Sequence, residues 1–464
     1  MRFDEHFIQG ALTEVSIVNA VFPLDPQFSI DTRTLKQGDI FFALPGAQVD
    51  GHDFVADAIK KGAGGICIAH DKKDILKTVD ADVLKKKLIL VVPKPEYALI
   101  RLATVWRSFF NYPVVAITGS VGKTSTKELL AHVLDMHGIP YMVSFGNQNT
   151  KIGVALNILR MRTSHKVAIF EVGINKRNEM ARISDILRPT TAVITKIGHS
   201  HMEGLGSVVD IALEKRDVFK YFTAENIGVI NGDQLLLSQV GYPHPVLKFG
   251  TKTTNQIQAR KIHIGTSATT FTLKIYKEKY NISIANVHEG AVFNSLAVAS
   301  VAHLLGVPAE GIVAAINAPP VISGRFETRA FKDKSKGALI DDCYSANPES
   351  MKAALLAFQK IDTRAKKVVV LGDMLELGMN SPFWHRQLGR FLRKVPSLKH
   401  AIFVGDLVKW TSKTVPVGLA ITCVSDWKEA ITQLNEILDE ESLVLVKGSN
   451  GMGLTNLVRE MADK

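Results

Sequence analysis

The sequence is poor in cysteine and lacks any long hydrophobic run. Its 464 residues include three cysteines, too few for a disulfide framework, and none stands in a metal-type pair. Residues 1–20 mix acidic, histidine and glutamine side chains among the apolar ones, unlike a signal peptide. No segment approaches the ~18 consecutive apolar residues of a membrane span. We therefore expect a reduced, cytoplasmic protein that is neither secreted nor inserted into a membrane.

Charge of one sign is not concentrated anywhere in the chain. The 56 Lys and Arg residues exceed the 45 Asp and Glu residues and leave a net charge of +11, compatible with a polyanionic substrate such as a nucleotide. The basic residues are scattered, and the densest run, Lys85-Lys86-Lys87, is expected to be a solvated face. Nucleic acid is therefore not an expected partner. At about 150 residues per domain, the length predicts roughly three domains.

Short apolar runs alternate with helical patterns from residue 114 onward. Such runs are typical of strands buried on both faces, and strands joined by helices predict a mostly parallel sheet with helices on both faces. The runs are Val114–Ile117, Val167–Val172, Ala192–Ile197 and Ile227–Asn231. Residues 257–285 instead alternate apolar and polar side chains, which predicts an antiparallel excursion attached to this domain.

A second alternation begins near Gly337 and predicts a doubly wound, Rossmann-like C-terminal domain. Its expected strands are 338–340, 367–371, 401–404 and 443–446, and its expected helices begin at Pro348, Pro382 and Trp427. We therefore predict an α/β protein of three domains: a small N-terminal α/β domain over 1–98, a central P-loop-type domain over 99–327, and the C-terminal domain over 328–464.

The sharpest local motif lies between the first strand and the first helix of the central domain. It reads Thr118-Gly119-Ser120-Val121-Gly122-Lys123-Thr124-Ser125. Glycines let backbone N–H groups form a concave phosphate nest, and the following helix N-terminus adds a favourable dipole. Lys123 would reach the β and γ phosphates, and Thr124 would offer a hydroxyl to Mg²⁺. The common P-loop has Gly where this chain has Ile117. The alternative is a glycine-containing turn beside a surface lysine.

Polar residues also follow other strands at their carboxyl ends, where ligands of parallel sheets collect. Glu171 ends an apolar run, and it is either a metal ligand or a satisfied buried carboxylate. His199 and His201 follow the next strand and are either ligands or packed, capping histidines. In the C-terminal domain, polar loops after three strands form a second expected wall of the site. These loops are Asp341-Asp342 with Tyr344 and Asn347, Gly372-Asp373-Met374, and Lys447-Gly448-Ser449.

With these motifs, the chain resembles the Mur ligase family, ATP-dependent amide-forming enzymes of bacterial cell-wall precursor synthesis. The resemblance covers nearly the whole length. It is carried by residues 29–35, 38–46 and 50–54 in the first domain, by Asn147, Asn149, Thr150, 171–173 and 197–207 in the second, and by 341–351, 372–378 and 446–449 in the third. The family usually has Asn where this chain has Lys196 or Ser345, Arg where it has Asn450, and His where it has Gly290.

The third-domain motifs resemble the member type that adds D-alanyl-D-alanine to UDP-N-acetylmuramoyl-tripeptide, giving the pentapeptide. The resemblance therefore implies these two substrates, ATP and Mg²⁺ as cofactors, and a monomer. It implies that the tripeptide carboxylate is activated as an acyl phosphate, which the dipeptide amine then attacks. The first domain would bind the UDP-linked peptide, and the third would close over ATP and bind the incoming dipeptide.

The resemblance also assigns roles to individual residues. Lys123, Glu171, His201 and Lys215 would be catalytic, with Thr124, Glu171, His201 and a carbamylated Lys215 holding Mg²⁺. By its pattern alone, Lys215 is expected on a helix surface. ATP contacts would come from Gly119 to Ser125, Asn294, Arg325 and Asp342. Substrate contacts would come from Ser29, Asp31, Thr32, Arg33, Gly46, Asp50, His52, Asn149, Thr150, Tyr344, Asn347, Lys447 and Ser449.

Two alternatives stay open at this point. One is another member of the superfamily, such as the ligase that adds the third amino acid or a folylpolyglutamate synthase. The other is a P-loop ATPase or nucleotide switch that acts on a protein or nucleic-acid partner. For that second alternative, the first ~98 residues would lack affinity for a nucleotide sugar, and hydrolysis would proceed without a tripeptide.

Overall fold

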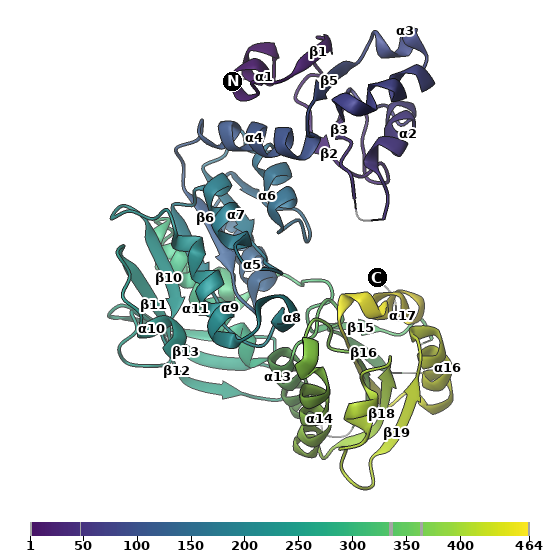
Figure 1. Ribbon diagram of the computed structural model, residues 1–464. Helices are drawn as coiled ribbons and strands as arrows, with labels where there is room; N and C mark the ends of the chain where they lie inside the picture. The colour runs from purple at the N-terminus through teal and green to yellow at the C-terminus, as the bar shows by residue number, and fades with distance from the viewer. Residues whose placement is uncertain (1, 47, 334–336, 362–364, 463–464) are drawn as a thin grey trace. The chain divides into compact units, whose positions relative to one another are not determined.

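The computed structural model describes residues 2–46, 48–333, 337–361 and 365–462. The chain divides into two compact units (Figure 1). Unit 1 comprises residues 1–114, 140–172 and 182–189, and unit 2 comprises residues 115–139, 173–181 and 190–464. Each unit is built of helices and mostly parallel strands. Within the described residues, no helix combines the length and the apolar character needed to cross a bilayer.

Unit 1 begins with a five-stranded sheet in the order β1-β5-β4-β3-β2. All neighbours are parallel except β1 and β5. Strands β4 and β5 are buried at every position, as expected for apolar runs in a parallel sheet. The strands are β1 (Ser16–Asn19), β2 (Phe28–Ser29), β3 (Ile40–Phe42), β4 (Gly65–Ala69) and β5 (Leu88–Val92); the helices are α1 (Glu5–Ala11), α2 (Val55–Lys60), α3 (Ala81–Leu84) and α4 (Pro95–Arg107).

Unit 1 also holds a parallel pair of strands, β7 (Tyr141–Val143) and β8 (Val167–Glu171). Helix α6 (Lys151–Ile158) connects them, and α7 (Glu179–Leu187) follows β8. The predicted strand 167–172 is confirmed except for its last residue. Its final position, Glu171, therefore stands at the carboxyl end of a buried strand.

The central domain supplies the first part of unit 2, with strands in the order β14-β13-β12-β11-β10-β9-β6. Strands β6 to β12 pair in parallel, and β12, β13 and β14 are antiparallel, which confirms the predicted excursion. The strands are β6 (Val114–Thr118), β9 (Thr191–Ile194), β10 (Ile227–Asn231), β11 (Val246–Gly250), β12 (Ile257–Ile264), β13 (Thr269–Ile275) and β14 (Glu278–Ile284). The helices are α5 (Lys123–Met136), α8 (Met202–Leu205), α9 (Val208–Arg216), α10 (Leu235–Ser238), α11 (Glu289–Leu304) and α12 (Ala309–Asn317).

The C-terminal domain has a six-stranded sheet in the order β15-β16-β20-β17-β18-β19, antiparallel only at β15. Two separate apolar cores cover its faces, one with α13 and α14 and the other with α16 and α17, as Figure 1 shows. This is the predicted doubly wound arrangement. The strands are β15 (Glu327–Ala330), β16 (Ala338–Asp341), β17 (Lys366–Gly372), β18 (Leu398–Val404), β19 (Ala420–Val424) and β20 (Ser442–Lys447); the helices are α13 (Pro348–Lys360), α14 (Ser381–Phe391), α15 (Lys409–Ser412), α16 (Trp427–Ile437) and α17 (Leu454–Met461).

Candidate active site

The phosphate-loop motif connects β6 to α5, as predicted. Gly119 and Gly122 have φ values of +148° and +92°, which L-residues with a Cβ rarely adopt. A Cβ on Gly119 would collide with the hydroxyl of Thr195, and one on Gly122 would lie 2.5 Å from Oδ1 of Asn294. The loop is therefore a close-packed backbone cradle at the N-terminus of a 14-residue helix. Such a cradle fits a phosphate group.

Lys123, Thr124 and Arg325 lie together at this loop. The Lys123 ammonium donates to the carbonyl oxygen of Gly119 at 2.9 Å, so the loop itself orients the lysine. The Arg325 guanidinium donates from Nη2 to Oγ1 of Thr124 at 3.0 Å and stacks 4.2 Å from the ring centre of Tyr344. Its Nε is buried and has no hydrogen-bond partner among the described residues. A buried, unused donor beside a phosphate cradle fits a polyanionic ligand.

The loop after β9 is bound to the phosphate loop by hydrogen bonds that end on backbone carbonyl oxygens. The Thr195 hydroxyl lies 2.6 Å from the carbonyl oxygen of Val121. The backbone N–H of Ser120 donates to the carbonyl of Lys196 at 2.6 Å, and its hydroxyl donates to the carbonyl of Gly198 at 3.0 Å. The predicted strand 192–197 is therefore shorter than expected, because β9 ends at Ile194 and the next residues turn toward the phosphate loop.

His201 meets a carboxylate of the C-terminal domain. Its Nδ1 lies 2.6 Å from Oε2 of Glu376, and the backbone N–H of Glu203 donates to the carbonyl of Glu376 at 3.0 Å. The close approach of the His201 ring holds the pKa of the Glu376 carboxyl below its usual range. A histidine whose one nitrogen faces a carboxylate is a common arrangement for metal ligands, because the carboxylate orients the ring. The second nitrogen, Nε2, is then the one suited to a cation.

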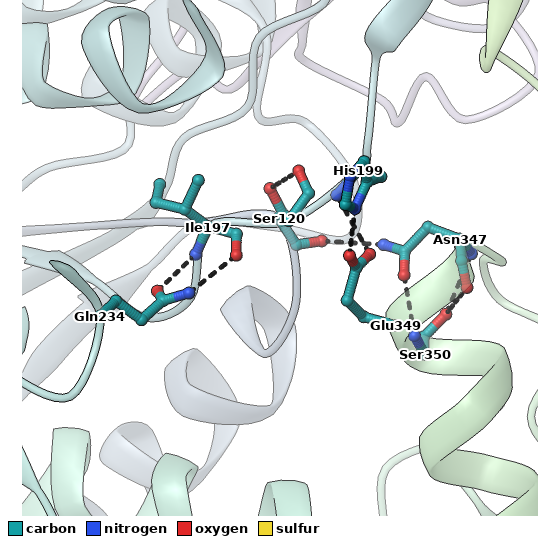
Figure 2. A network of polar contacts seen from close by, with 8 residues as sticks. Ser120, Ile197, His199, Gln234, Asn347, Glu349 and Ser350 are labelled. Atoms are coloured by element: carbon teal, nitrogen blue, oxygen red, sulfur yellow. Dashed lines mark hydrogen bonds and ion pairs between the residues drawn. The ribbon is translucent and has the colours of Figure 1, made fainter. Parts of the chain in front are cut away.

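Several residues of the C-terminal domain that were predicted to contact ligands make hydrogen bonds or ion pairs with protein groups. Lys447 is buried and lies 2.8 Å from the carboxylate of Asp342, and it also donates to the carbonyl of Ser345 at 2.9 Å. The Ser449 hydroxyl accepts from the backbone N–H of Leu375 at 2.9 Å. Asn347 is the N-cap of α13 and reaches the phosphate loop, donating to the carbonyl of Ser120 at 3.3 Å (Figure 2). These groups hold the loops after β16, β17 and β20 in place.

Lys215 is fully buried on α9, so its expected place on a helix surface was wrong. The helix turns Lys215 inward together with Glu214, and the charged run Glu214-Lys215-Arg216-Asp217 gave no sign of this burial in the sequence. A buried ammonium carries a large desolvation cost, which favours a modified or paired state of the nitrogen.

Glu171 and Asn149 lie together within unit 1. The carboxylate is buried and accepts from Nδ2 of Asn149 at 3.0 Å, while the backbone N–H of Glu171 donates to the hydroxyl of Ser144 at 2.9 Å. Thr150, next in the chain, is exposed at the start of α6.

The predicted residues of the N-terminal domain form two small clusters within unit 1. Asp31 accepts from the backbone and guanidinium of Arg33, and the side-chain hydrogen bond lowers the pKa of Asp31. Ser29 accepts from the backbone N–H of Asp31. Thr32 is buried, and Gly46 makes a tight turn in which its N–H donates to the carbonyl of Val49.

The second of these clusters is Asp50 with His52. Asp50 accepts from the backbone N–H of His52 at 3.0 Å and contacts Nδ1 of its ring at 2.6 Å. Nε2 of the same ring accepts from the backbone N–H of Ala69 at 3.0 Å. Both ring nitrogens are therefore engaged inside the protein, so His52 holds β4 to the loop around Asp50.

Together, the α/β fold, the glycine cradle and the converging basic groups define a nucleotide-binding enzyme. Three family descriptions match successive parts of the chain. They are "Mur ligase family, catalytic domain" over residues 27–104, "Mur ligase middle domain" over 117–302 and "Mur ligase, glutamate ligase domain" over 324–450. The chain belongs to the Mur ligase family, as its motifs predicted.

Relatives and solved structures match over almost the full length. A UDP-N-acetylmuramoyl-tripeptide–D-alanyl-D-alanine ligase of Bacillus subtilis (strain 168) is 30% identical over 439 residues, covering 93% of this chain and 92% of that protein. The crystal structure of MurF from Acinetobacter baumannii has a TM-score of 0.83 at 26% identity and covers 98% of both chains. The MurF ligase from Thermotoga maritima in complex with ADP has a TM-score of 0.78 at 25% identity, over 94% of this chain and 96% of that one. The predicted three-domain α/β fold is thereby confirmed.

Four residues of the site were not given a role from the sequence: Thr195, Gln234, Glu349 and Glu376. The Gln234 side chain accepts from the N–H of Ile197 at 2.7 Å and donates to its carbonyl at 2.8 Å, as Figure 2 shows. Glu349 stands in the first turn of α13, where a carboxylate is explained by the helix dipole alone. No local pattern distinguishes such a residue from one that reaches another domain.

Proposed function

We propose that this chain is the ATP-dependent ligase that adds D-alanyl-D-alanine to UDP-N-acetylmuramoyl-tripeptide. The observation that carries the proposal is the glycine cradle at Lys123 and Thr124, with Arg325 bound to the same threonine. The full-length similarity to ligases named for this reaction supports the choice of substrates. ATP is the nucleotide, in keeping with the ADP complex of the Thermotoga maritima ligase.

The ATP contacts proposed for this site are the residues of the phosphate loop together with Asn294, Arg325 and Asp342. Backbone N–H groups of Gly119 to Ser125 and the ammonium of Lys123 neutralise the phosphates. Arg325 adds its buried Nε donor, which lacks a partner among the described residues. Asn294 lies with its Oδ1 3.5 Å from the hydroxyl of Thr126, on the α11 side of the loop. Positioning and charge neutralisation are the main catalytic tasks in phosphoryl transfer.

Mg²⁺ is the metal proposed for the site. As the family resemblance implies, the residues that would hold it are Thr124 through its hydroxyl, Glu171 through its carboxylate, His201, and Lys215 as a carbamate. When bound, Mg²⁺ neutralises phosphate charge and orients the oxygens around phosphorus. Carbamylation converts the buried Lys215 cation into an anion, which removes the repulsion that an ammonium would exert on a nearby metal ion.

The proposed reaction activates a carboxylate, which by itself is a poor electrophile. A terminal carboxylate oxygen of the tripeptide attacks the γ-phosphorus of ATP, and the bond from that phosphorus to ADP breaks. The free amine of D-alanyl-D-alanine then attacks the carbonyl carbon of the acyl phosphate. The tetrahedral intermediate loses phosphate and a proton, and an amide remains. The residues of this chain bind, orient and neutralise charge in both steps.

The substrates are assigned to the outer domains. We assign the UDP-linked peptide to the domain over 1–98, with contacts from Ser29, Asp31, Thr32, Arg33, Gly46, Asp50 and His52, and further contacts from Asn149 and Thr150 in the domain over 99–327. We assign the dipeptide to the domain over 328–464, with contacts from Tyr344, Asn347, Lys447 and Ser449. The protein acts as a cytoplasmic monomer in this proposal, which size-exclusion chromatography with light scattering tests.

The decisive experiment measures ADP release in a matrix of substrates. UDP-N-acetylmuramoyl-tripeptides that end in lysine or diaminopimelate are each combined with D-alanyl-D-alanine or with alanine. We expect one ADP and one UDP-linked pentapeptide per turnover, and only with a tripeptide plus the dipeptide. Turnover with single amino acids would favour a different ligase of the superfamily. Hydrolysis that proceeds without any tripeptide would favour a P-loop ATPase. Lys123→Ala is the control that removes nucleotide-dependent activity.

A further inference from the structure

Glu349 of the C-terminal domain binds a single residue of the central domain through both of its carboxylate oxygens. It occupies the second position of α13, and its two oxygens bind two groups of His199. Oε1 lies 2.5 Å from the ring Nδ1, and Oε2 accepts from the backbone N–H at 3.0 Å (Figure 2). A first-turn carboxylate is favourable for any helix. The helix dipole does not explain why both oxygens reach the same residue of another domain.

The surroundings of this contact are shaped to receive the carboxylate. A Cβ on Gly198 would lie 2.8 Å from Cδ of Glu349, so a glycine at this position allows the close approach. On α14 of the C-terminal domain, Trp384 places its ring centre 4.2 Å from that of His199. The side chains of His199 and Glu349 are 27% and 21% exposed, and hydrogen bonds to a charge are strengthened by such partial desolvation.

The loop that contains His199 also supports the phosphate loop. Ser120 binds the carbonyl of Gly198 through its hydroxyl, and Gln234 holds both backbone groups of Ile197. The N-cap residue of α13 also contacts the phosphate loop. Nδ2 of Asn347 donates to the carbonyl of Ser120 at 3.3 Å, while its Oδ1 accepts from the N–H of Ser350 at 2.8 Å. Figure 2 shows these contacts as one connected network.

We propose that Glu349 is a positioning residue that acts through His199 to seat the C-terminal domain on the phosphate loop. The inference rests on the proposed function, because it concerns the ATP-dependent step of that reaction. Glu349 contributes no atom to the chemistry. It fixes α13 so that Asn347 reaches Ser120 and the loop that begins at Asp342 is held over the nucleotide. Without the contact between Glu349 and His199, the two domains would still fold but would spend less time in the arrangement that binds ATP productively.

The test uses the full-length chain and four variants. Glu349→Gln keeps the size of the side chain and removes its charge, His199→Ala removes the receiving ring, and a double variant combines them. Glu310→Gln is the matched control, because Glu310 is an exposed glutamate at the same second position of another helix, α12. Steady-state kinetics with ATP and the UDP-linked tripeptide varied separately are the first measurement. Small-angle X-ray scattering with a non-hydrolysable ATP analogue is the second.

We expect Glu349→Gln and His199→Ala each to lower kcat/KM for ATP by about tenfold, the loss of roughly one hydrogen bond to a charged group. The KM for the UDP-linked tripeptide should stay unchanged, and the double variant should be no worse than either single variant. Nucleotide-induced compaction should weaken in all three and persist in Glu310→Gln. Effects that multiply in the double variant, or a Glu349→Gln protein that behaves like Glu310→Gln, would overturn the proposal.

The scattering experiment needs no acceptor substrate. If the unmodified protein fails to join the proposed substrates, the proposed function fails, and the compaction of Glu349→Gln against Glu310→Gln still decides whether Glu349 seats the domain.

Discussion

The ring nitrogen Nδ1 of His201 lies 2.6 Å from Oε2 of Glu376, and both residues have left-handed backbone, with φ values of 56° and 63°. Non-glycine residues seldom adopt this conformation, and such strain is found preferentially at functional sites. The pair connects the central domain to the loop that follows β17. Because Glu376 engages one nitrogen, it fixes the direction in which the other nitrogen of His201 points.

Glu376→Gln is expected to weaken the dependence of the reaction on Mg²⁺. A neutral amide orients the ring less firmly, so the half-saturating Mg²⁺ concentration should rise by about 10-fold or more. Ligase activity measured across a Mg²⁺ titration checks this. Glu203→Gln is the control, since Glu203 is an exposed carboxylate on α8, two positions after His201. An unchanged titration curve for Glu376→Gln would contradict the orienting role.

Gly119→Ala is expected to abolish productive nucleotide binding, because the added Cβ would collide with Thr195 in the floor of the phosphate cradle. The affinity for ATP, measured by isothermal titration calorimetry, should fall by at least about tenfold, or 1.4 kcal/mol. Gly138→Ala separates the clash from backbone strain. Gly138 also has a positive φ, but nothing lies within 4 Å of its Cβ position. It should cost about 1 kcal/mol of stability and leave ATP affinity intact.

Lys215→Ala is expected to lower ligase activity by about 10- to 100-fold, as is typical when a group that supports a metal is lost. Short carboxylates added to the assay should restore part of the activity by replacing the carbamate. Lys220→Ala, which changes an exposed lysine just beyond α9, should retain full activity. Full activity of Lys215→Ala in the absence of added carboxylates would rule out the carbamate. Carbamate carbon from isotope-labelled bicarbonate, observed by NMR, is the direct measurement.

The fold was predictable wherever burial on both faces leaves continuous apolar runs. Strand β10 matches its predicted bounds, and the helices expected from Pro348 and Trp427 begin at those residues. Strand β19 was not predicted, because this edge strand is largely exposed and its residues alternate only weakly. The three domain ranges stay a prediction. Local patterning therefore identifies the interior of each sheet better than its edges.

The residues of the site that form a contiguous motif were predictable, and those that depend on contacts between distant segments were not. The phosphate loop was recognisable because its glycines, lysine and threonine are contiguous. The partners that hold it were not, because His199 and Glu349 are separated by 150 positions in the sequence. The prediction that Lys215 lies on a helix surface was wrong for a related reason, because the helix pattern around it gave no sign of burial. Residues that act through a contact between distant segments produce no recognisable spacing pattern in the sequence.

Asp50→Ala is expected to destabilise the N-terminal domain in a pH-dependent way. Asp50 accepts from the backbone and the ring of His52 and lies 3.0 Å from the ammonium of Lys72. These interactions lower its pKa, with the backbone hydrogen bond from His52 as the largest cause. Loss of this cap should cost about 1 kcal/mol at pH 7, seen as roughly fivefold faster opening of β4 in hydrogen exchange corrected for intrinsic rates. Asp53→Ala, at an exposed neighbour, is the control.

The sign of the pH effect follows from the direction of the shift. A carboxyl whose pKa is lower in the folded than in the unfolded protein stabilises the fold above its unfolded-state pKa, about 4 for Asp. That contribution disappears as the pH falls through the lower, folded-state pKa. The exchange difference between Asp50→Ala and the unmodified protein should therefore be complete at neutral pH and shrink only below about pH 4. A difference that grows on acidification would show that Asp50 does not hold the loop through its charge.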